Sequence, residues 1–198
     1  MTPRDAIFSR IKAALSEAPG DSGTQPPAAR LVDPPREDRV ARFCDALTAL
    51  AGKVIKVRDA DEARRELGRM LAGKRVVASR SAILGGLGEE YSREACAAAD
   101  VGLTSADFAL ADTGSLVFLT ESHESRLISL LPPCHIAVIE RDKILSSLDE
   151  LLSRVPHPSV QSSAMVFITG PSRTADIEMR LVRGVHGPGE IIVIIIET

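Results

Sequence analysis

The chain has 198 residues, of which 44% are apolar and 26% are charged, so the composition predicts a globular core and excludes global disorder. The formal net charge is −3 at pH 7, and only 3% of the residues are aromatic. No basic surface is indicated, and few rings are available to stack on bases, so we expect no nucleic-acid partner.

The three cysteines, Cys44, Cys96 and Cys134, lie far apart and form no C-x-x-C pair. This spacing excludes the usual zinc-ribbon and iron–sulfur arrangements, and a sparse odd count is typical of a reducing compartment. The first ten residues have no apolar stretch like that of a secretory signal, and the run at 191–196 is too short to cross a bilayer. We therefore expect a cytoplasmic protein without a membrane span.

The N-terminal part of the sequence differs from the rest. In residues 3–18 the apolar side chains recur at helical spacing, at Ile7, Ile11, Ala14 and Leu15. The following stretch is rich in Pro, Gly and Ser and has no periodicity, which is typical of a linker. We predict two parts: residues 1–35 as an N-terminal helix with an extended linker, and residues 36–198 as an α/β domain. The helix is a candidate contact in a homo-oligomer.

The second part alternates between helical and extended patterns. Helices are predicted at 36–51, 59–72, 81–91, 141–152 and 174–183. Strands are predicted at 53–57, 75–79, 100–104, 115–120, 135–140, 164–169 and 191–196. Strands of nearly continuous Val and Ile with helices between them indicate a mostly parallel sheet covered on both faces. Residues 105–120 hold two apolar runs close together, which indicates a hairpin-like or bent insertion.

Ligands of open α/β sheets bind beyond the carboxyl ends of the strands, so polar residues that follow strands are the candidates for a site. In 105–115, Asp107 and Asp112 bracket a turn, and the turn offers hydroxyls and backbone N–H groups to an anion at Thr113, Gly114 and Ser115. The alternative is a β-turn stabilised by the aspartates, which the local pattern slightly favours.

Arg126 follows the strand at 115–120 and can bind a carboxylate or a phosphate. The alternative is a surface ion pair with Glu121 or Glu124. His123 lies among polar residues and is expected to be solvated. His135 begins a strand, a position more typical of a structural hydrogen bond than of a catalytic base.

The segment after the strand at 164–169 carries several candidates. Gly170 permits an unusual turn, and Ser172 or Thr174 can cap the predicted helix, whose first turn holds Asp176. Such a helix start is an anion site, and it lies beside Arg173. Capping accounts for the hydroxyls and the acid but not for an Arg at that end. The alternative is that Arg173 is buried and pairs with Asp176 or Glu178.

Gly184 is predicted to end that helix, and His186 then lies in a tight turn before the last strand. A neutral imidazole there can transfer a proton near pH 7, so His186 is the catalytic candidate. A loop histidine that bonds the backbone is an equal alternative. We expect Thr113, Gly114, Ser115, Ser172, Arg173 and Thr174 to line one polar pocket at the carboxyl edge of the sheet, with Arg126 as a second cation.

Three stretches together resemble the LUD-domain family, in its lactate-utilization branch: "VGLTSADFALADTGSLVF", "SRLISLLPPCHIAVIE" and "ITGPSRTADIEMRLVRGVHGPGEIIVIIIE". The resemblance implies a three-layer α/β/α fold similar to the NagB/RpiA/CoA-transferase superfamily. It also implies a role beside two iron–sulfur partner proteins in oxidising L-lactate to pyruvate. The iron–sulfur clusters would belong to those partners, and no metal or cofactor is expected in this chain.

Two places depart from the family pattern. Ser105 stands where the family has a glycine, and the segment after Tyr91 runs on without a further strand and loop. Two other functions stay open beside the family role. One is a stand-alone transferase or ligase acting on an anionic acyl or folate-like substrate, and the other is a non-catalytic assembly module.

Overall fold

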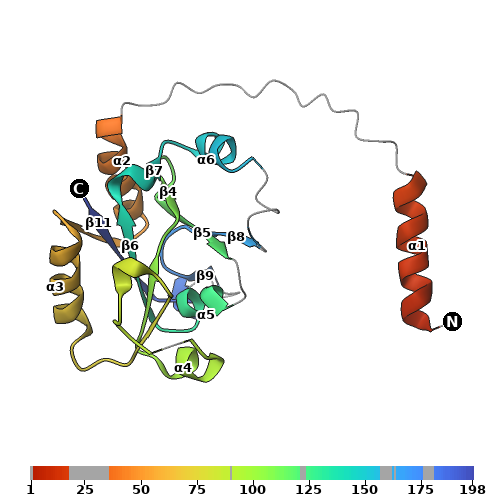
Figure 1. Ribbon diagram of the computed structural model, residues 1–198, viewed down its shortest axis with the longest axis horizontal. Helices are drawn as coiled ribbons and strands as arrows, with labels where there is room; N and C mark the ends of the chain where they lie inside the picture. Colours follow the sequence, from red (N-terminus) through yellow and green to blue (C-terminus); the bar gives the residue numbers. More distant parts are fainter. Residues whose placement is uncertain are drawn as a thin grey trace. The chain divides into compact units, whose positions relative to one another are not determined.

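The computed structural model describes residues 2–17, 36–89, 91–120, 124–156, 162, 164–175 and 181–198, in two compact units, Met1–Leu31 and Val32–Thr198. Helix α1 (Pro3–Glu17) forms the first unit and confirms the predicted N-terminal helix (Figure 1). A reciprocal cap begins it, since the Thr2 N–H donates to Asp5 Oδ2 at 2.9 Å and the Asp5 N–H donates to Thr2 Oγ1 at 3.2 Å. Three large apolar side chains of α1 are exposed: Ile7, Phe8 and Ile11.

A five-stranded sheet forms the centre of the second unit (Figure 1). Its order is β1-β11-β6-β3-β2, and every neighbouring pair is parallel. The strands are β1 (Lys53–Val57), β2 (Val76–Ala78), β3 (Val101–Ser105), β6 (Cys134–Glu140) and β11 (Glu190–Ile196). The predicted parallel sheet is thus confirmed, with all of its strands at the predicted places.

A second sheet of four strands has the order β7-β4-β5-β8. Its members are β4 (Phe108–Leu110), β5 (Ser115–Thr120), β7 (Ile144–Leu145) and β8 (Ala164–Ile168). Strands β4 and β5 are antiparallel and joined by a tight turn, which confirms the predicted hairpin, while β4 and β7 are parallel.

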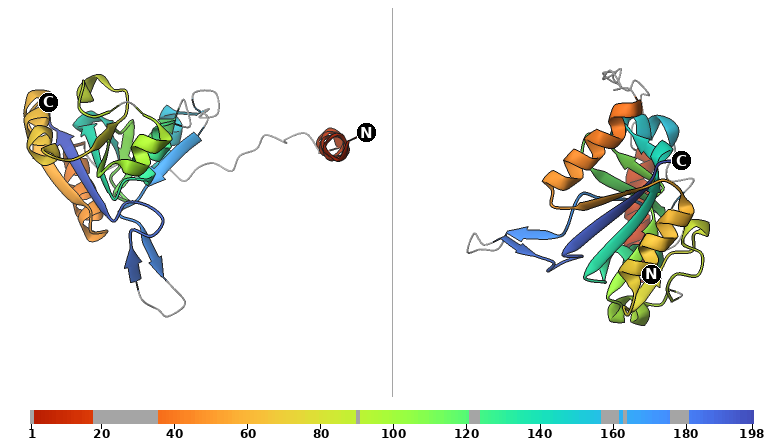
Figure 2. Two further views of the ribbon diagram at one scale, coloured as in Figure 1. Left: turned by 90° about the horizontal axis from the view of Figure 1, so that it is seen from below. Right: turned by 90° about the vertical axis from the view of Figure 1, so that its left-hand side faces the viewer.

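The two faces of the five-stranded sheet are covered differently (Figure 2). Helix α3 (Ala60–Leu71) and the short helix η1 (Ala82–Leu84) pack on one face. Helix α2 (Arg36–Ala49) and the second sheet pack on the other, together with α4 (Arg93–Ala98) and α5 (Glu124–Leu130). The predicted α/β/α layering is therefore corrected, because one outer layer is partly a β-sheet.

The sequence of β5 explains this second sheet. Its Leu116 and Phe118 pack toward the five-stranded sheet, whereas Val117 packs in a separate core with Leu151 of α6 (Leu148–Arg154). A strand that is apolar on both faces is stable only when both faces are buried. The β4–β5 hairpin therefore lies between the five-stranded sheet and α6 instead of on the surface. The relation to the NagB/RpiA/CoA-transferase superfamily stays a prediction.

Three predicted helices are wrong. Residues 81–91 form only η1 and turns, and 141–152 divides into a short helix η2 (Arg141–Lys143), β7 and the start of α6. Residues 174–183 contain no helix among those described: β9 (Arg173–Ala175) and β10 (Leu181–Arg183) form an antiparallel hairpin that projects from the body (Figure 2).

The ends of this hairpin show why it is not a helix. The Gly184 N–H donates to the Ser172 C=O at 3.1 Å, which joins the two ends of the segment. A helix over the ten residues at 174–183 would hold its ends roughly 15 Å apart. The hydrogen bond between the two ends of the segment thus excludes the helix that the local sequence pattern predicts. Among the described residues, no helix is long and apolar enough to cross a membrane.

Candidate functional site

The candidate residues from two loops meet at the C-terminal end of α2. That helix ends on Ala51, whose φ of 67° is left-handed although it is not a glycine. The Gly52 N–H donates to Leu47 C=O at 2.9 Å and the Ala51 N–H donates to Thr48 C=O at 2.8 Å, as in a Schellman motif. This pattern closes the end of the helix and leaves the Leu50 C=O for a partner from elsewhere.

Arg173 is that partner. Its Nη2 donates to the Leu50 C=O, 123 residues earlier in the chain. A guanidinium at a helix C-terminus satisfies an unpaired carbonyl and opposes the negative end of the helix dipole. The predicted conflict of Arg173 with a helix N-terminus disappears, because the segment it begins is a strand. Arg173 is exposed, so the alternative of a buried Arg is wrong.

Two glycines bring their loops against the same end of α2. Gly114 has a φ of 66°, and a Cβ added there would lie 2.5 Å from the Leu47 nitrogen. Gly170 has a φ of 81°, and its added Cβ would lie 2.9 Å from the Leu50 Cβ. Both positions therefore need glycine for the backbone angle and for the close approach to α2.

A chain of hydroxyls links the two loops beside these glycines. Thr113 Oγ1 and Ser115 Oγ are 2.8 Å apart, and Ser115 Oγ and Thr169 Oγ1 are 2.7 Å apart. Ser115 is 4% exposed, whereas Thr113 and Thr169 are exposed. Thr169 is not among the predicted site residues, although its place between an apolar strand and Gly170 was a usable signal. We call Thr113, Gly114, Ser115, Thr169, Gly170 and Arg173 the α2 seam.

The α2 seam lies at the amino edge of the five-stranded sheet, so the predicted carboxyl edge is wrong. Helix α2 leads directly into Lys53, the first residue of β1. On the other side of the seam, the Ser172 N–H donates to Pro188 C=O at 2.9 Å, just before β11 begins. The seam follows the carboxyl end of β8, but β8 belongs to the second sheet and ends where the parallel strands start.

The remaining residues of the C-terminal motif lie beside the seam. Ser172 is tied through its backbone to Gly184 and Pro188, and Thr174 lies in β9. His186 is exposed in the turn before β11, which confirms its predicted turn, although Gly184 follows a strand and not a helix. Asp176 and Glu178 fall outside the described residues, and so does any pairing with Arg173.

Asp107 lies away from the seam, and Arg126 lies in helix α5. The Leu119 N–H donates to Asp107 Oδ2 at 2.7 Å, which places Asp107 near the far end of β5. Ser115 begins that strand, and four residues of extended chain span roughly 13 Å. Arg126 is half-buried on α5, which follows the end of β5. Asp112 is exposed in the β4–β5 turn, and His123 falls outside the described residues.

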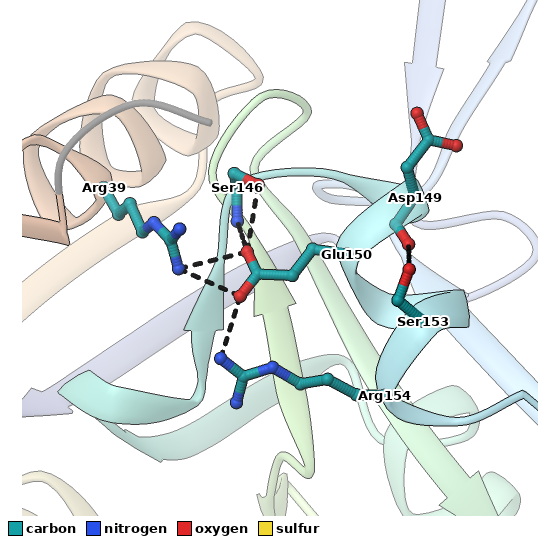
Figure 3. Close-up of polar contacts among 6 residues, drawn as sticks. All are labelled: Arg39, Ser146, Asp149, Glu150, Ser153 and Arg154. Carbon is teal, nitrogen blue, oxygen red and sulfur yellow. Dashed lines mark hydrogen bonds and ion pairs between the residues drawn. The ribbon is translucent and has the colours of Figure 1, made fainter. Parts of the chain in front are cut away.

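A second polar cluster surrounds Glu150 of α6 (Figure 3). The Ser146 N–H and hydroxyl donate to Glu150 Oε2 at 2.8 and 2.9 Å, and Arg154 Nη2 donates to Oε1 at 2.8 Å. Nη1 of Arg39, in α2, lies 3.0 Å from Glu150 Oε2, and 10% of the Arg39 side chain is exposed. Burial raises the pKa of the Glu150 carboxyl, but the hydrogen bonds from Ser146 and Arg154, with the charge of Arg39, lower it to about 2.

This cluster is structural. The carboxylate is fully occupied by donors and stays ionised at neutral pH, so it has neither a free lone pair nor a proton to offer a substrate. It joins α2, α6 and the end of β7 at one point. Within the described ranges no three His, Cys, Asp or Glu side chains gather to hold a metal ion.

His135 is buried between the sheets, with 0% of its surface exposed. Its Nε2 and Thr104 Oγ1 are 2.8 Å apart, which confirms the predicted structural hydrogen bond. Burial lowers the pKa of the imidazole to about 4, so the ring is neutral at pH 7. The ring of Phe118 lies beside it, with centroids 5.8 Å apart.

Comparison with known proteins places the seam within a recognised domain. The LUD domain profile matches residues 86–196. Two relatives called lactate utilization protein C match at 40% identity over 104 residues, in Halalkalibacterium halodurans, and at 41% over 103 residues, in an Exiguobacterium species. Each match covers 50% of this chain and 45% of the relative. A lactate utilization protein C 1 of Bacillus mycoides is 36% identical over 117 residues, covering 57% of this chain and 50% of its own.

The chain thus spans about half the length of the curated relatives it matches. A solved structure has the same fold. It is a DUF162 family protein from Deinococcus radiodurans, with a TM-score of 0.65 over 82% of this chain and 99% of that one. Sequence identity between the two is 22%, so the likeness concerns the fold alone.

Proposed function

This chain belongs to the LUD domain family, and on that premise we propose that it is a component, like lactate utilization protein C, of a system that oxidises L-lactate to pyruvate. One observation carries the proposal: over about half of its length, the chain is 33–41% identical to proteins that bear that name. The matched family region includes every residue of the α2 seam, so the motif that prompted the resemblance lies within the shared part.

The chemistry of this reaction calls for an electron carrier. Oxidation of a 2-hydroxy acid to a 2-oxo acid removes two electrons and two protons from the substrate. We propose that iron–sulfur clusters on two partner proteins receive the electrons, and that this chain contributes to substrate binding or to assembly.

For substrate binding we propose the exposed side of the α2 seam. The guanidinium of Arg173 is exposed where it binds the Leu50 C=O. At the same end of α2, the hydroxyl chain includes two exposed threonines, Thr113 and Thr169. A guanidinium beside hydroxyl donors suits a carboxylate. We propose His186, exposed in the neighbouring turn, as the group that moves a proton. Ser172 and Thr174 continue this surface, while Asp107 and Arg126 would serve a separate contact at the far end of β5.

The test begins with a deletion of the gene in cells that grow on L-lactate. We expect loss of growth and of lactate oxidation in extracts, with both restored by the wild-type gene. A tagged chain recovered from such cells should bring iron–sulfur proteins and lactate-oxidising activity with it. Unimpaired lactate oxidation in a strain without any second copy would reject the proposed function.

Arg173 variants then test the seam. Arg173→Lys keeps the charge but not the planar fork, and Arg173→Gln removes the charge. If the seam binds the substrate carboxylate, both variants raise the lactate concentration needed for half-maximal oxidation, and Gln raises it more. Equal saturation curves for the wild type and both variants would remove the seam from substrate binding.

A non-catalytic assembly role is the second candidate, and one observation favours it. The polar groups of the seam already hold the end of α2 in place, whereas α1 exposes Ile7, Phe8 and Ile11. In that case Arg173→Gln retains lactate oxidation, while the double variant Ile7→Asp, Ile11→Asp no longer brings the partner proteins with it. Retained partners in the double variant would reject this role for α1.

A further inference from the structure

The C-terminal turn of α5 lies unusually close to β3. A Cβ added to Gly102 would lie 1.8 Å from the Ile128 carbonyl oxygen and 3.2 Å from the Pro132 Cγ. No side chain larger than hydrogen fits there, so the backbone of α5 rests on the sheet at Gly102. Ile128 is 2% exposed, and its carbonyl is therefore remote from solvent.

The sequence deprives this carbonyl of its usual donor. In an α-helix the C=O of residue 128 accepts from the N–H of residue 132, but residue 132 is a proline and has none. The same holds for Ser129, because residue 133 is also a proline. Of the three carbonyls at residues 127–129, the Leu127 C=O alone accepts the usual helical hydrogen bond, from the Leu131 N–H at 3.0 Å. A buried carbonyl without a donor costs free energy, so a donor from elsewhere is expected.

His135, on the strand next to Gly102, has a side chain that can supply one. In the β3–β6 register Gly102 pairs with His135, so the imidazole rises from the sheet beside the Ile128 carbonyl. Its Nε2 is engaged with Thr104 Oγ1. Its Nδ1 is buried and has no hydrogen-bond partner among the residues that the structure describes. Two buried polar groups thus lie close to Gly102: the Ile128 carbonyl of α5, whose usual helical donor is missing, and Nδ1 of His135 in β6.

We propose that His135 carries its proton on Nδ1 and donates it through one buried water to the Ile128 carbonyl, while Nε2 accepts from the Thr104 hydroxyl. A neutral imidazole has one donor and one acceptor nitrogen, so the two bonds use the ring completely. The opposite tautomer would turn a nitrogen lone pair toward a carbonyl oxygen and leave both acceptors unsatisfied.

This bond makes His135 a positioning residue for α5. It ties the helix to β3 and β6 at the point where two prolines end it. It also gives the motif "ISLLPPCH" one physical reason: the prolines remove two donors, and the histidine that follows replaces one of them. The inference does not depend on the proposed lactate function, since it concerns the tautomer and the seat of α5.

The tautomer can be measured directly. A long-range proton–nitrogen NMR spectrum of the full chain with labelled histidines separates Nδ1–H from Nε2–H rings, and His135→Gln identifies the signal of His135. We expect the Nδ1–H form, with a proton that exchanges slowly with water. An Nε2–H ring at His135 overturns the proposal. We also expect magnetisation transfer from a bound water to the Nδ1 proton, and its absence overturns the water-bridged bond.

Two variants test whether His135 holds α5 through its Nδ1 hydrogen bond or only by filling space. Asn places an amide nitrogen near the position of Nδ1, whereas Gln reaches the position of Nε2. We expect amide hydrogen exchange at Leu127–Leu131 to rise at least tenfold in His135→Gln and much less in His135→Asn. The reverse order overturns the proposal. If neither variant folds, sequential assignment of the wild-type spectrum identifies the His135 signal, and its tautomer still decides.

Thr104→Val supplies the control, because it removes the hydroxyl and keeps the shape. If the Ile128 carbonyl sets the tautomer, His135 stays protonated on Nδ1 in this variant. A switch to Nε2–H shows that Thr104 alone determined the proton position, and the proposal fails.

Discussion

Two glycines with the same left-handed backbone separate conformational strain from steric contact. Gly73 and Gly114 have φ values of 73° and 66°. A Cβ at Gly73 would meet nothing within 4 Å, whereas a Cβ at Gly114 would lie 2.5 Å from the Leu47 nitrogen. We predict that Gly73→Ala lowers the free energy of unfolding by about 1 kcal/mol, the cost of the backbone angle alone.

Gly114→Ala should lower the free energy of unfolding by about 3 kcal/mol or more, because α2 also has to move away from the β4–β5 turn. Urea unfolding of both variants measures the difference. Equal losses would show that the close approach of the turn to α2 contributes nothing to stability.

His135 makes the stability of the protein depend on pH. The pKa of its imidazole is about 4 in the folded state, because burial disfavours the charged ring, against an ordinary 6.5. Between these values the unfolded chain binds the proton and the folded chain does not, so stability is present above pH 6.5 and falls as the pH is lowered. The expected loss from pH 7 to pH 5 is about 2 kcal/mol.

The measurement compares urea unfolding of the wild type and His135→Gln at both pH values. The variant has no imidazole at this position. Its loss of unfolding free energy between pH 7 and pH 5 should therefore be smaller than that of the wild type by about 2 kcal/mol. The other three histidines are common to both proteins and cancel in the comparison. The same slope for the two proteins would mean that His135 titrates normally in the folded state.

At the scale of elements, Glu150 joins α2, α6 and β7 through its carboxylate. Glu150→Gln leaves Arg39 mostly buried without its counter-charge, so we predict a loss of about 3 kcal/mol in the free energy of unfolding. The control is Glu140→Gln, which breaks an exposed 2.8 Å pair with Lys143 and should cost less than about 0.5 kcal/mol. Thermal or urea unfolding checks both, and equal losses would contradict the structural role of the cluster.

The pKa of the Glu150 carboxyl adds a pH dependence with its own window. The hydrogen bonds and charges that outweigh burial lower it to about 2, from an ordinary 4.5. The stability it contributes is present above pH 4.5 and is lost as the pH falls toward 2. This window lies below that of His135, so the two groups can be told apart in an acid titration.

At the scale of the whole molecule, the last strand, β11, holds the first strand, β1, in the sheet. Strand β1 pairs with β11 and with no other described strand, and β11 also pairs with β6. In β11, the side chains of Val193, Ile194 and Ile195 are 0% exposed. We predict that a chain ending before Glu190 shows no cooperative thermal unfolding, because β1 and both cores lose their partner.

The control for this truncation removes only Glu197 and Thr198. These two residues are exposed and contribute backbone bonds to Val57 and Arg58, of 2.9 and 3.1 Å. The shortened chain should keep cooperative unfolding, with a small decrease in its midpoint. Cooperative unfolding of the longer truncation, followed by circular dichroism, would show that β11 is dispensable.

The sequence by itself determined the elements with a strong local pattern. The strands of the parallel sheet and the helices α1, α2 and α3 were predicted at their places, because apolar periodicity and helix caps act within a few residues. The linked motifs also identified the LUD domain family, since their combination is specific. For the site, the sequence identified which loops carry the polar residues, and two of these loops do meet in the α2 seam.

Only the tertiary structure decided how those elements and side chains combine. The partner of Arg173 is a carbonyl 123 residues away. The prediction of a helix at 174–183 was wrong because the Gly184 N–H bonds the Ser172 C=O and joins the two ends of the segment. The seam lies at the amino edge because β8 pairs with β5 and not with the parallel strands. Local patterns state which residues must be buried or paired but not with what, because the pairing depends on groups far apart in the chain.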